Sequence, residues 1–119
     1  MMAKPLGKHI LLEFFGCNPQ RIEKKEALRD VIVEASRLAN ATVVTDVFHN
    51  FSPFGVSGVV VIAESHVAIH TWPEYGVASV DIFSCSDKMN PQVIEDQIAR
   101  YLQAESVEKR EFERGKKRV

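Results

Sequence analysis

Residues 56–85 read VSGVVVIAESHVAIHTWPEYGVASVDIFSC, and this stretch decides the fold that we predict for the chain. Its β-branched and aromatic residues predict three strands, at Val56–Glu64, His66–Trp72 and Val77–Cys85. The four residues Pro73-Glu74-Tyr75-Gly76 predict a hairpin loop between the last two strands. The run from Val59 to Ile62 does not alternate between apolar and polar residues, which is typical of a strand covered on both faces.

The segments on either side of this stretch complete an α+β layout. Further strands are predicted at His9–Phe15, Ala41–Phe51 and Val107–Arg114. Asn18-Pro19 and Asn90-Pro91 each combine a helix cap with a proline at the first helical position. Apolar residues then recur at helical spacing, as far as Asn40 in the first helix and Leu102 in the second. The predicted fold is a two-layer α/β sandwich with an antiparallel sheet, in the order β-α-β-β-β-β-α-β.

Length and charge limit the classes of function. A chain of 119 residues predicts a single domain, residues 1–119. With 15 basic and 16 acidic residues the net charge is -1, so neither nucleic acid nor an anionic membrane is an expected partner. The apolar run Ile10–Phe15 is short and interrupted by Glu13, which excludes a signal peptide or membrane span and predicts a cytoplasmic protein. Cys17 and Cys85 are therefore expected to be free thiols.

The chemistry-bearing residues show no metal-binding spacing. The chain has four histidines and two cysteines, but they form no His-x-His, Cys-x-x-Cys or HExxH motif. We therefore predict no metal site.

Two helices can cover only one face of the sheet, whereas the third strand is predicted to be buried on both. In so short a chain the simplest cover for the second face is another copy of the chain. We therefore predict a homodimer that packs sheet to sheet in four layers, αββα.

The hairpin register predicts where the polar residues lie. If Trp72 faces Val77, antiparallel pairing sets Ser65 opposite Ser84 and Glu64 opposite Cys85. A tight hairpin around Ser65 similarly sets Ser57 near His70.

His70 cannot meet Ser65 on a regular strand. It follows Ser65 by five residues, which corresponds to about 16 Å, and the odd separation turns it to the other face. Either a β-bulge brings the two together or the His70 that meets Ser65 belongs to the partner protomer.

These motifs resemble the short bacterial and archaeal form of S-adenosylmethionine decarboxylase. The resemblance runs from His9-Ile10-Leu11-Leu12-Glu13-Phe14 to Glu113-Arg114-Gly115 and is densest between Phe51 and Cys85. It is carried by Phe51, Pro53, Gly55–Ile62, Glu64-Ser65-His66, Ile69–Gly76 and Asp81–Cys85.

The resemblance implies a proenzyme that cleaves itself between Glu64 and Ser65. The products are a β chain of residues 1–64 and an α chain of residues 65–119, whose first residue becomes a pyruvoyl group. This group supplies the electrophilic carbonyl that decarboxylation of an amino acid requires, through a Schiff base and without pyridoxal phosphate. In the family pattern His70 takes the α-proton during processing, and Ser57 supports the intermediate.

The resemblance also implies the substrate contacts. Cys85 matches the proton donor of the decarboxylation, since an ordinary thiol is protonated at neutral pH. Phe51 and Trp72 match positions that stack on adenine, and Glu74 matches a ribose-binding carboxylate. Glu13 matches a carboxylate that orients either the substrate or the processing step. The implied product, decarboxylated S-adenosylmethionine, is an aminopropyl donor for spermidine and polyamine synthesis.

Two other functions remain open from the sequence. A pyruvoyl-dependent arginine decarboxylase is similar through the cleavage motif and differs in its substrate contacts. A non-catalytic α+β dimer that binds a nucleoside-like ligand would use the aromatic residues without cleaving its chain.

Overall fold

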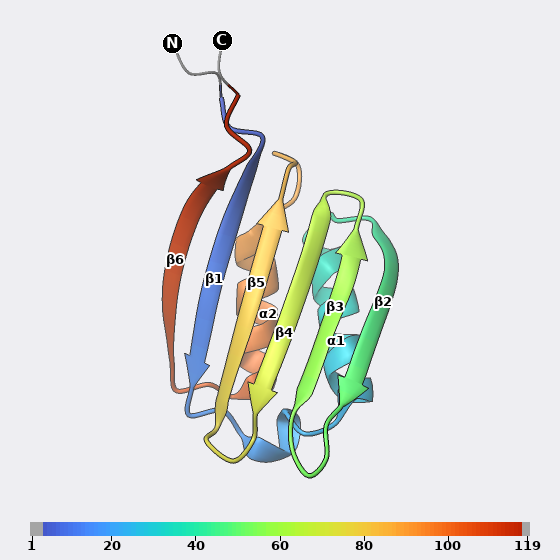
Figure 1. Cartoon of the computed structure of the whole chain (residues 1–119), viewed down its shortest axis with the longest axis vertical. Helices are drawn as coiled ribbons and strands as arrows, with labels where there is room; N and C mark the ends of the chain where they lie inside the picture. Colours follow the sequence, from blue (N-terminus) through green and yellow to red (C-terminus); the bar gives the residue numbers. More distant parts are fainter. Residues whose placement is uncertain (1–3, 118–119) are drawn as a thin grey trace.

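A computed structural model describes residues 4–117 of the chain. The bounds of the predicted domain, Met1 and Val119, lie outside the described residues. The elements follow the predicted order, and their bounds are β1 Gly7–Phe15, a 3-10 helix Pro19–Arg21, α1 Lys25–Leu38, β2 Val43–Asn50, β3 Val56–Ile62, β4 Ser65–Trp72, β5 Val77–Ser84, α2 Pro91–Leu102 and β6 Ser106–Arg114. The strands form one antiparallel sheet in the order β2-β3-β4-β5-β1-β6, and α1 and α2 lie side by side behind it (Figure 1).

The first helix begins later than the sequence predicted. Asn18 accepts a hydrogen bond from the Gln20 N–H and Pro19 follows it, but the turn that they start is a short 3-10 helix. The α-helix begins only at Lys25, after a break, so the prediction that it starts at Pro19 was wrong. A capping residue followed by proline favours the first turn of a 3-10 helix as well as that of an α-helix. At α2 the same signal is confirmed, because Asn90 caps the Gln92 N–H and the helix starts at Pro91.

The hydrophobic core lies between the helices and one face of the sheet. Each helix turns one apolar stripe toward it, through Leu28 and Ile32 of α1 and Ile94 and Ile98 of α2, all nearly inaccessible to solvent. The facing strand residues are equally buried: Ile10, Leu12, Phe14, Val60, Ile62, Val67, Ile69, Val80 and Ile82. Full burial of such a side chain contributes about 1.5–3 kcal/mol, so this layer stabilises the strands that carry the site.

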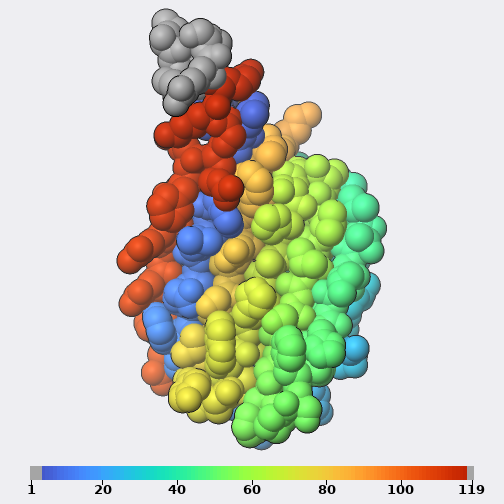
Figure 2. All heavy atoms as spheres, in the orientation of Figure 1, coloured from blue at the N-terminus to red at the C-terminus, as the bar shows by residue number. Residues whose placement is uncertain are grey.

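The opposite face of the sheet, which we call the open face, is covered by no helix in the described chain (Figure 2). Burial alternates along β4 and β5, so every second residue points to this face. Within the valine run, Val60 is fully buried but Val61 is 37% exposed. The helices thus cover one face only, as predicted, and within the described residues nothing covers the other. The prediction that a second copy of the chain covers it stays a prediction.

Candidate active site

Ser65 lies at a strained corner of the backbone. Ala63 and Glu64 form a two-residue turn between β3 and β4, because Ile62 pairs directly with Ser65. The φ angle of Ser65 is +153°, in a region of backbone space that glycine occupies and other residues avoid. A residue held in such a conformation costs about 1–3 kcal/mol and persists only where its surroundings impose it. The Glu64–Ser65 peptide is thus held in a strained geometry.

Hydrogen bonds fix the carbonyl and side chain of Glu64 at this corner. The Glu64 carbonyl oxygen accepts the backbone N–H of Cys85 at 2.9 Å. The Glu64 side chain accepts the backbone N–H of Thr42 at 3.0 Å, and Ser65 pairs with Ser84. The predicted hairpin register is therefore confirmed. A donor on the carbonyl oxygen withdraws electrons from its carbon, which makes the carbon more susceptible to a nucleophile.

A second polar pair lies toward the other end of β4. Ser57 faces His70 across β3 and β4, and its Oγ is 2.8 Å from Nδ1 of His70. β4 pairs with β3 on one side and with β5 on the other, and neither pairing has a register shift between Ser65 and His70. With no bulge in the strand, the rise of about 3.3 Å per residue keeps His70 about 16 Å from Ser65 of its own chain.

The aromatic candidates gather at the His70 end of the sheet. Phe51 and Trp72 are half-exposed, 50% and 41%, although large aromatic side chains usually favour burial. Trp72 and Glu13 line a cavity of about 370 Å³ together with Tyr75, Val77 and Ser79. Phe51 and Glu74 do not line this cavity, and the Phe51 ring packs edge-on against His49 at 4.7 Å. The loops that carry Phe51 and Glu74 form the lower end of the molecule in Figure 2.

The two cysteines have different environments, and they form no disulfide. Cys17 is buried, and loss of solvation raises the pKa of its thiol to about 11. Cys85 is exposed beside the Ser65 corner and lines a cavity of about 660 Å³ with Gly7, Lys8 and Ser84. Of the two thiols, Cys85 is the one placed to contact a ligand.

Sequence reasoning missed two residues of the Trp72 cavity, Tyr75 and Ser79. Ser79 faces His70 across β4 and β5, and its hydroxyl donates to Oε2 of Glu13 at 2.5 Å. The register that set Ser65 opposite Ser84 also sets His70 opposite Ser79, so this signal was available. Tyr75 is 76% exposed and carried no pattern beyond its place in the hairpin loop.

The described chain has neither a metal-binding cluster nor a membrane-spanning helix. No group of three or more His, Cys, Asp or Glu side chains between residues 4 and 117 is arranged to hold a metal ion. Over the same residues, neither helix has the length and hydropathy of a membrane-spanning helix.

Comparison with known proteins gives one consistent result. The family model described as S-adenosylmethionine decarboxylase matches residues 8–115. S-adenosylmethionine decarboxylase proenzymes from Thermodesulfovibrio yellowstonii and Caldanaerobacter subterraneus are 44% and 48% identical over 110 residues, which is 92% of this chain and 82% and 89% of theirs. The crystal structure of the adenosylmethionine decarboxylase of Aquifex aeolicus has a TM-score of 0.88 at 38% identity, covering 95% of this chain and 93% of that one. A Trypanosoma brucei AdoMetDC structure, 13% identical with a TM-score of 0.59, shares only the fold and covers 86% of this chain and 44% of that one.

The α+β fold and these relatives define the class of protein as a decarboxylase, one of the carboxy-lyases. More specifically, the chain belongs to the S-adenosylmethionine decarboxylase family.

Proposed function

We propose that the chain is a proenzyme that cleaves itself between Glu64 and Ser65 and then converts S-adenosylmethionine to its decarboxylated form and carbon dioxide. The observation that carries this proposal is the corner itself. A hydroxyl-bearing residue with a φ of +153° follows a carbonyl whose oxygen accepts the Cys85 N–H at 2.9 Å. Backbone strain and a polarised carbonyl both favour attack on that peptide.

Processing begins when Ser65 Oγ attacks the Glu64 carbonyl carbon, forming an oxyoxazolidine whose oxyanion the Cys85 N–H stabilises. Breakage of the C–N bond converts the amide to an ester and frees the amine of residue 65. A base then removes the α-proton, the Cβ–O bond breaks, and the Glu64 carboxylate leaves from a dehydroalanine. Tautomerisation and hydrolysis release ammonia and leave a pyruvoyl group at residue 65. The β chain then ends at Glu64, and the α chain starts at residue 65.

His70 of a partner protomer is the base that we assign to this elimination. Its own Ser65 is about 16 Å away along a regular strand. Its Nδ1 is held by Ser57 at 2.8 Å, which leaves Nε2 to take the proton. Ser57 thereby positions the base.

The open face supports a dimer in which the two sheets stack in opposite directions. No helix covers this face in the described residues, and it carries His70, Ser57 and the part-exposed Val61 (Figure 2). Stacking the sheets head to tail brings the Ser65 corner of each protomer toward the partner's His70.

The residues of the mature site fit a pyruvoyl group at position 65. When formed, this group supplies a carbonyl that accepts the electrons released as carbon dioxide leaves. Cys85 donates the proton that the former α-carbon requires. Phe51 and Trp72 stack on the adenine and attract the sulfonium, and Glu74 binds the ribose. Glu13 orients the substrate or the processing step, and the product feeds spermidine and polyamine synthesis.

Two measurements test this function. Intact mass spectrometry of the purified protein is expected to show two chains, residues 1–64 and residues 65–119. The mass of the second chain should correspond to a pyruvoyl group in place of Ser65. The processed protein is then expected to release labelled carbon dioxide from S-adenosylmethionine. A chain of full mass after long incubation would refute the enzyme, whereas release from arginine but not from the sulfonium would reassign the substrate.

A further inference from the structure

A row of four directly opposed residues crosses the open face at His70. Ser57 on β3 faces His70 on β4, His70 faces Ser79 on β5, and Ser79 faces Glu13 on β1. Directly opposed residues present their side chains to the same face, with Cβ atoms about 4.5–5.5 Å apart. His70 therefore has a serine beside it on each neighbouring strand.

The two hydroxyl groups differ in what they can offer the imidazole. Ser57 is already hydrogen-bonded to Nδ1 of His70. Ser79 donates its hydroxyl to Oε2 of Glu13 at 2.5 Å. A serine has a single hydroxyl hydrogen, so Ser79 can only accept a hydrogen bond on its His70 side. An acceptor there favours the imidazolium, in which both ring nitrogens are donors.

The Glu13 carboxylate acts in the same direction through its charge. Neighbouring strands lie about 4.8 Å apart, so two strand spacings separate His70 from Glu13 by about 10 Å. The negative charge of Glu13 lies on the same face as the imidazole that takes up the proton. The other titratable or charged residues of this face are His9, His49, His66, Asp81, Glu108, Arg110 and Arg114. Glu13 differs from them because it is hydrogen-bonded to the residue that faces His70.

We propose that Ser79 and Glu13 are positioning residues for His70 in the processing step. When Nε2 of His70 has removed the α-proton of the partner protomer's Ser65, Ser79 accepts a hydrogen bond from the new Nε2–H while Ser57 stays on Nδ1, and the Glu13 carboxylate balances the charge. The inference rests on the proposed function and assigns Glu13 to processing, not to binding of the substrate.

The test follows cleavage of freshly translated chains over pH 5.5–9. Glu13→Gln and Ser79→Ala are expected to slow cleavage on the order of tenfold, and Ser79→Thr to restore it. The double variant should be no slower than either single one, because the two residues act as one unit.

Glu108→Gln is the matched control. Glu108 pairs with Glu13 and faces the same side, but it is one strand further from His70. The same charge change there should leave the cleavage rate at its wild-type value. Circular dichroism and size-exclusion chromatography show whether each variant is folded. If Glu13→Gln is not folded, Ser79→Ala alone provides the test.

The outcomes separate this inference from the proposed function. Wild-type chains that never cleave would refute the function itself. Wild-type chains that cleave, with folded Glu13→Gln and Ser79→Ala variants of unchanged rate and profile, would overturn only the role of this pair. A variant that cleaves normally but has a higher KM for S-adenosylmethionine after processing would overturn it in favour of substrate binding by Glu13.

Discussion

Ser57 and His70 are joined across β3 and β4 by a contact of 2.8 Å between Oγ and Nδ1. The contact is far along β4 from the corner at Ser65, although the proposed chemistry requires His70 at that corner. A regular strand holds the two apart, so the proposed chemistry requires a second protomer to complete the site. This arrangement can be tested by mixing chains.

We expect chains with Ser65→Ala and chains with His70→Ala each to fail in processing alone. A mixed dimer contains one site with an intact Ser65 and the partner's intact His70, so cleavage of the His70→Ala chain should recover. Removal of a base typically costs a factor of about 100 or more, which makes the recovery easy to see by mass spectrometry. Well-mixed heterodimers that remain uncleaved would refute the shared site.

The two cysteines should differ in reactivity toward iodoacetamide at pH 8. The pKa of buried Cys17 is about 11, so about one thiol in a thousand is ionised at that pH, and burial also blocks the reagent. Cys85 is exposed and should be alkylated first. Peptide mapping after partial labelling measures this order, and denatured protein, in which both react, is the control. Equal labelling of Cys17 in the native protein would contradict the structure.

Local chain geometry made much of the fold and site predictable. The four-residue loop after Trp72 fixes the pairing of β4 and β5, and a tight turn at Glu64 fixes β3 against β4. Because pairing advances one residue at a time, these two turns alone set Ser65 opposite Ser84 and Ser57 opposite His70. Residues of a hairpin are close in sequence, so their contacts follow from turn length and periodicity.

Contacts between distant segments could not be predicted in this way. The Glu13–Ser79 bond depends on β1 pairing with β5, and no turn joins those strands. The same limit applies to the first helix, where Pro19 signals a helical turn but not whether the chain continues as an α-helix. The valine run predicts a strand covered on both faces, but sequence records apolar character and not which molecule supplies the second cover.

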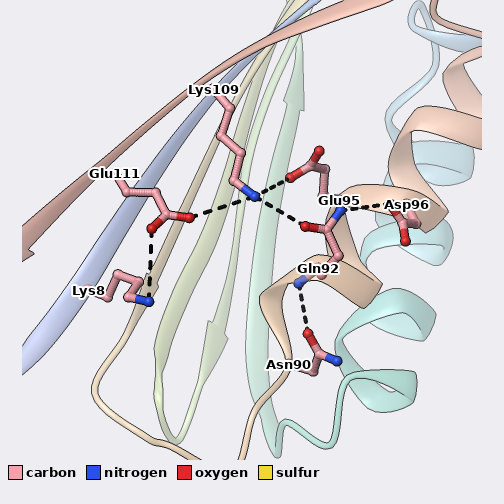
Figure 3. Close-up of polar contacts among 7 residues, drawn as sticks. All are labelled: Lys8, Asn90, Gln92, Glu95, Asp96, Lys109 and Glu111. Carbon is pink, nitrogen blue, oxygen red and sulfur yellow. Dashed lines mark hydrogen bonds and ion pairs between the residues drawn. The ribbon is translucent and has the colours of Figure 1, made fainter.

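The edge strand β6 should depend on Lys109 for its attachment to α2. On the helix side of the sheet, Lys109 Nζ lies 3.1 Å from Glu95 and 3.2 Å from the Gln92 side chain (Figure 3). The Glu95 side chain is only 12% exposed, so Lys109→Met leaves a poorly solvated carboxylate without its partner. We expect a loss of about 1–3 kcal/mol in the free energy of unfolding, measured by urea denaturation.

Lys8→Met serves as the control for this change. Lys8 lies 3.9 Å from Glu111 and both side chains are about half exposed, so its removal should cost less than about 0.5 kcal/mol. The double variant Lys109→Met with Glu95→Leu should regain much of the lost stability, because no unpaired charge remains. Equal effects of the two lysine changes would contradict a specific role for Lys109.

His66 should make the stability of the protein fall in mild acid. Burial is the main cause that lowers the pKa of His66 below its usual 6.5. The charge of His9 lowers this pKa further, and the charge of Asp81 opposes the change. Between the lowered pKa and 6.5 the unfolded chain binds the proton more readily than the folded one, so this contribution to stability is present above pH 6.5 and is lost as the pH falls. His66→Gln should therefore flatten the dependence of the urea midpoint on pH between 5 and 7, whereas His49→Gln at an exposed position should leave it unchanged. All samples need the same protein concentration, because association would also shift the midpoint. A pH dependence that His66→Gln does not alter would show that other groups account for the acid sensitivity.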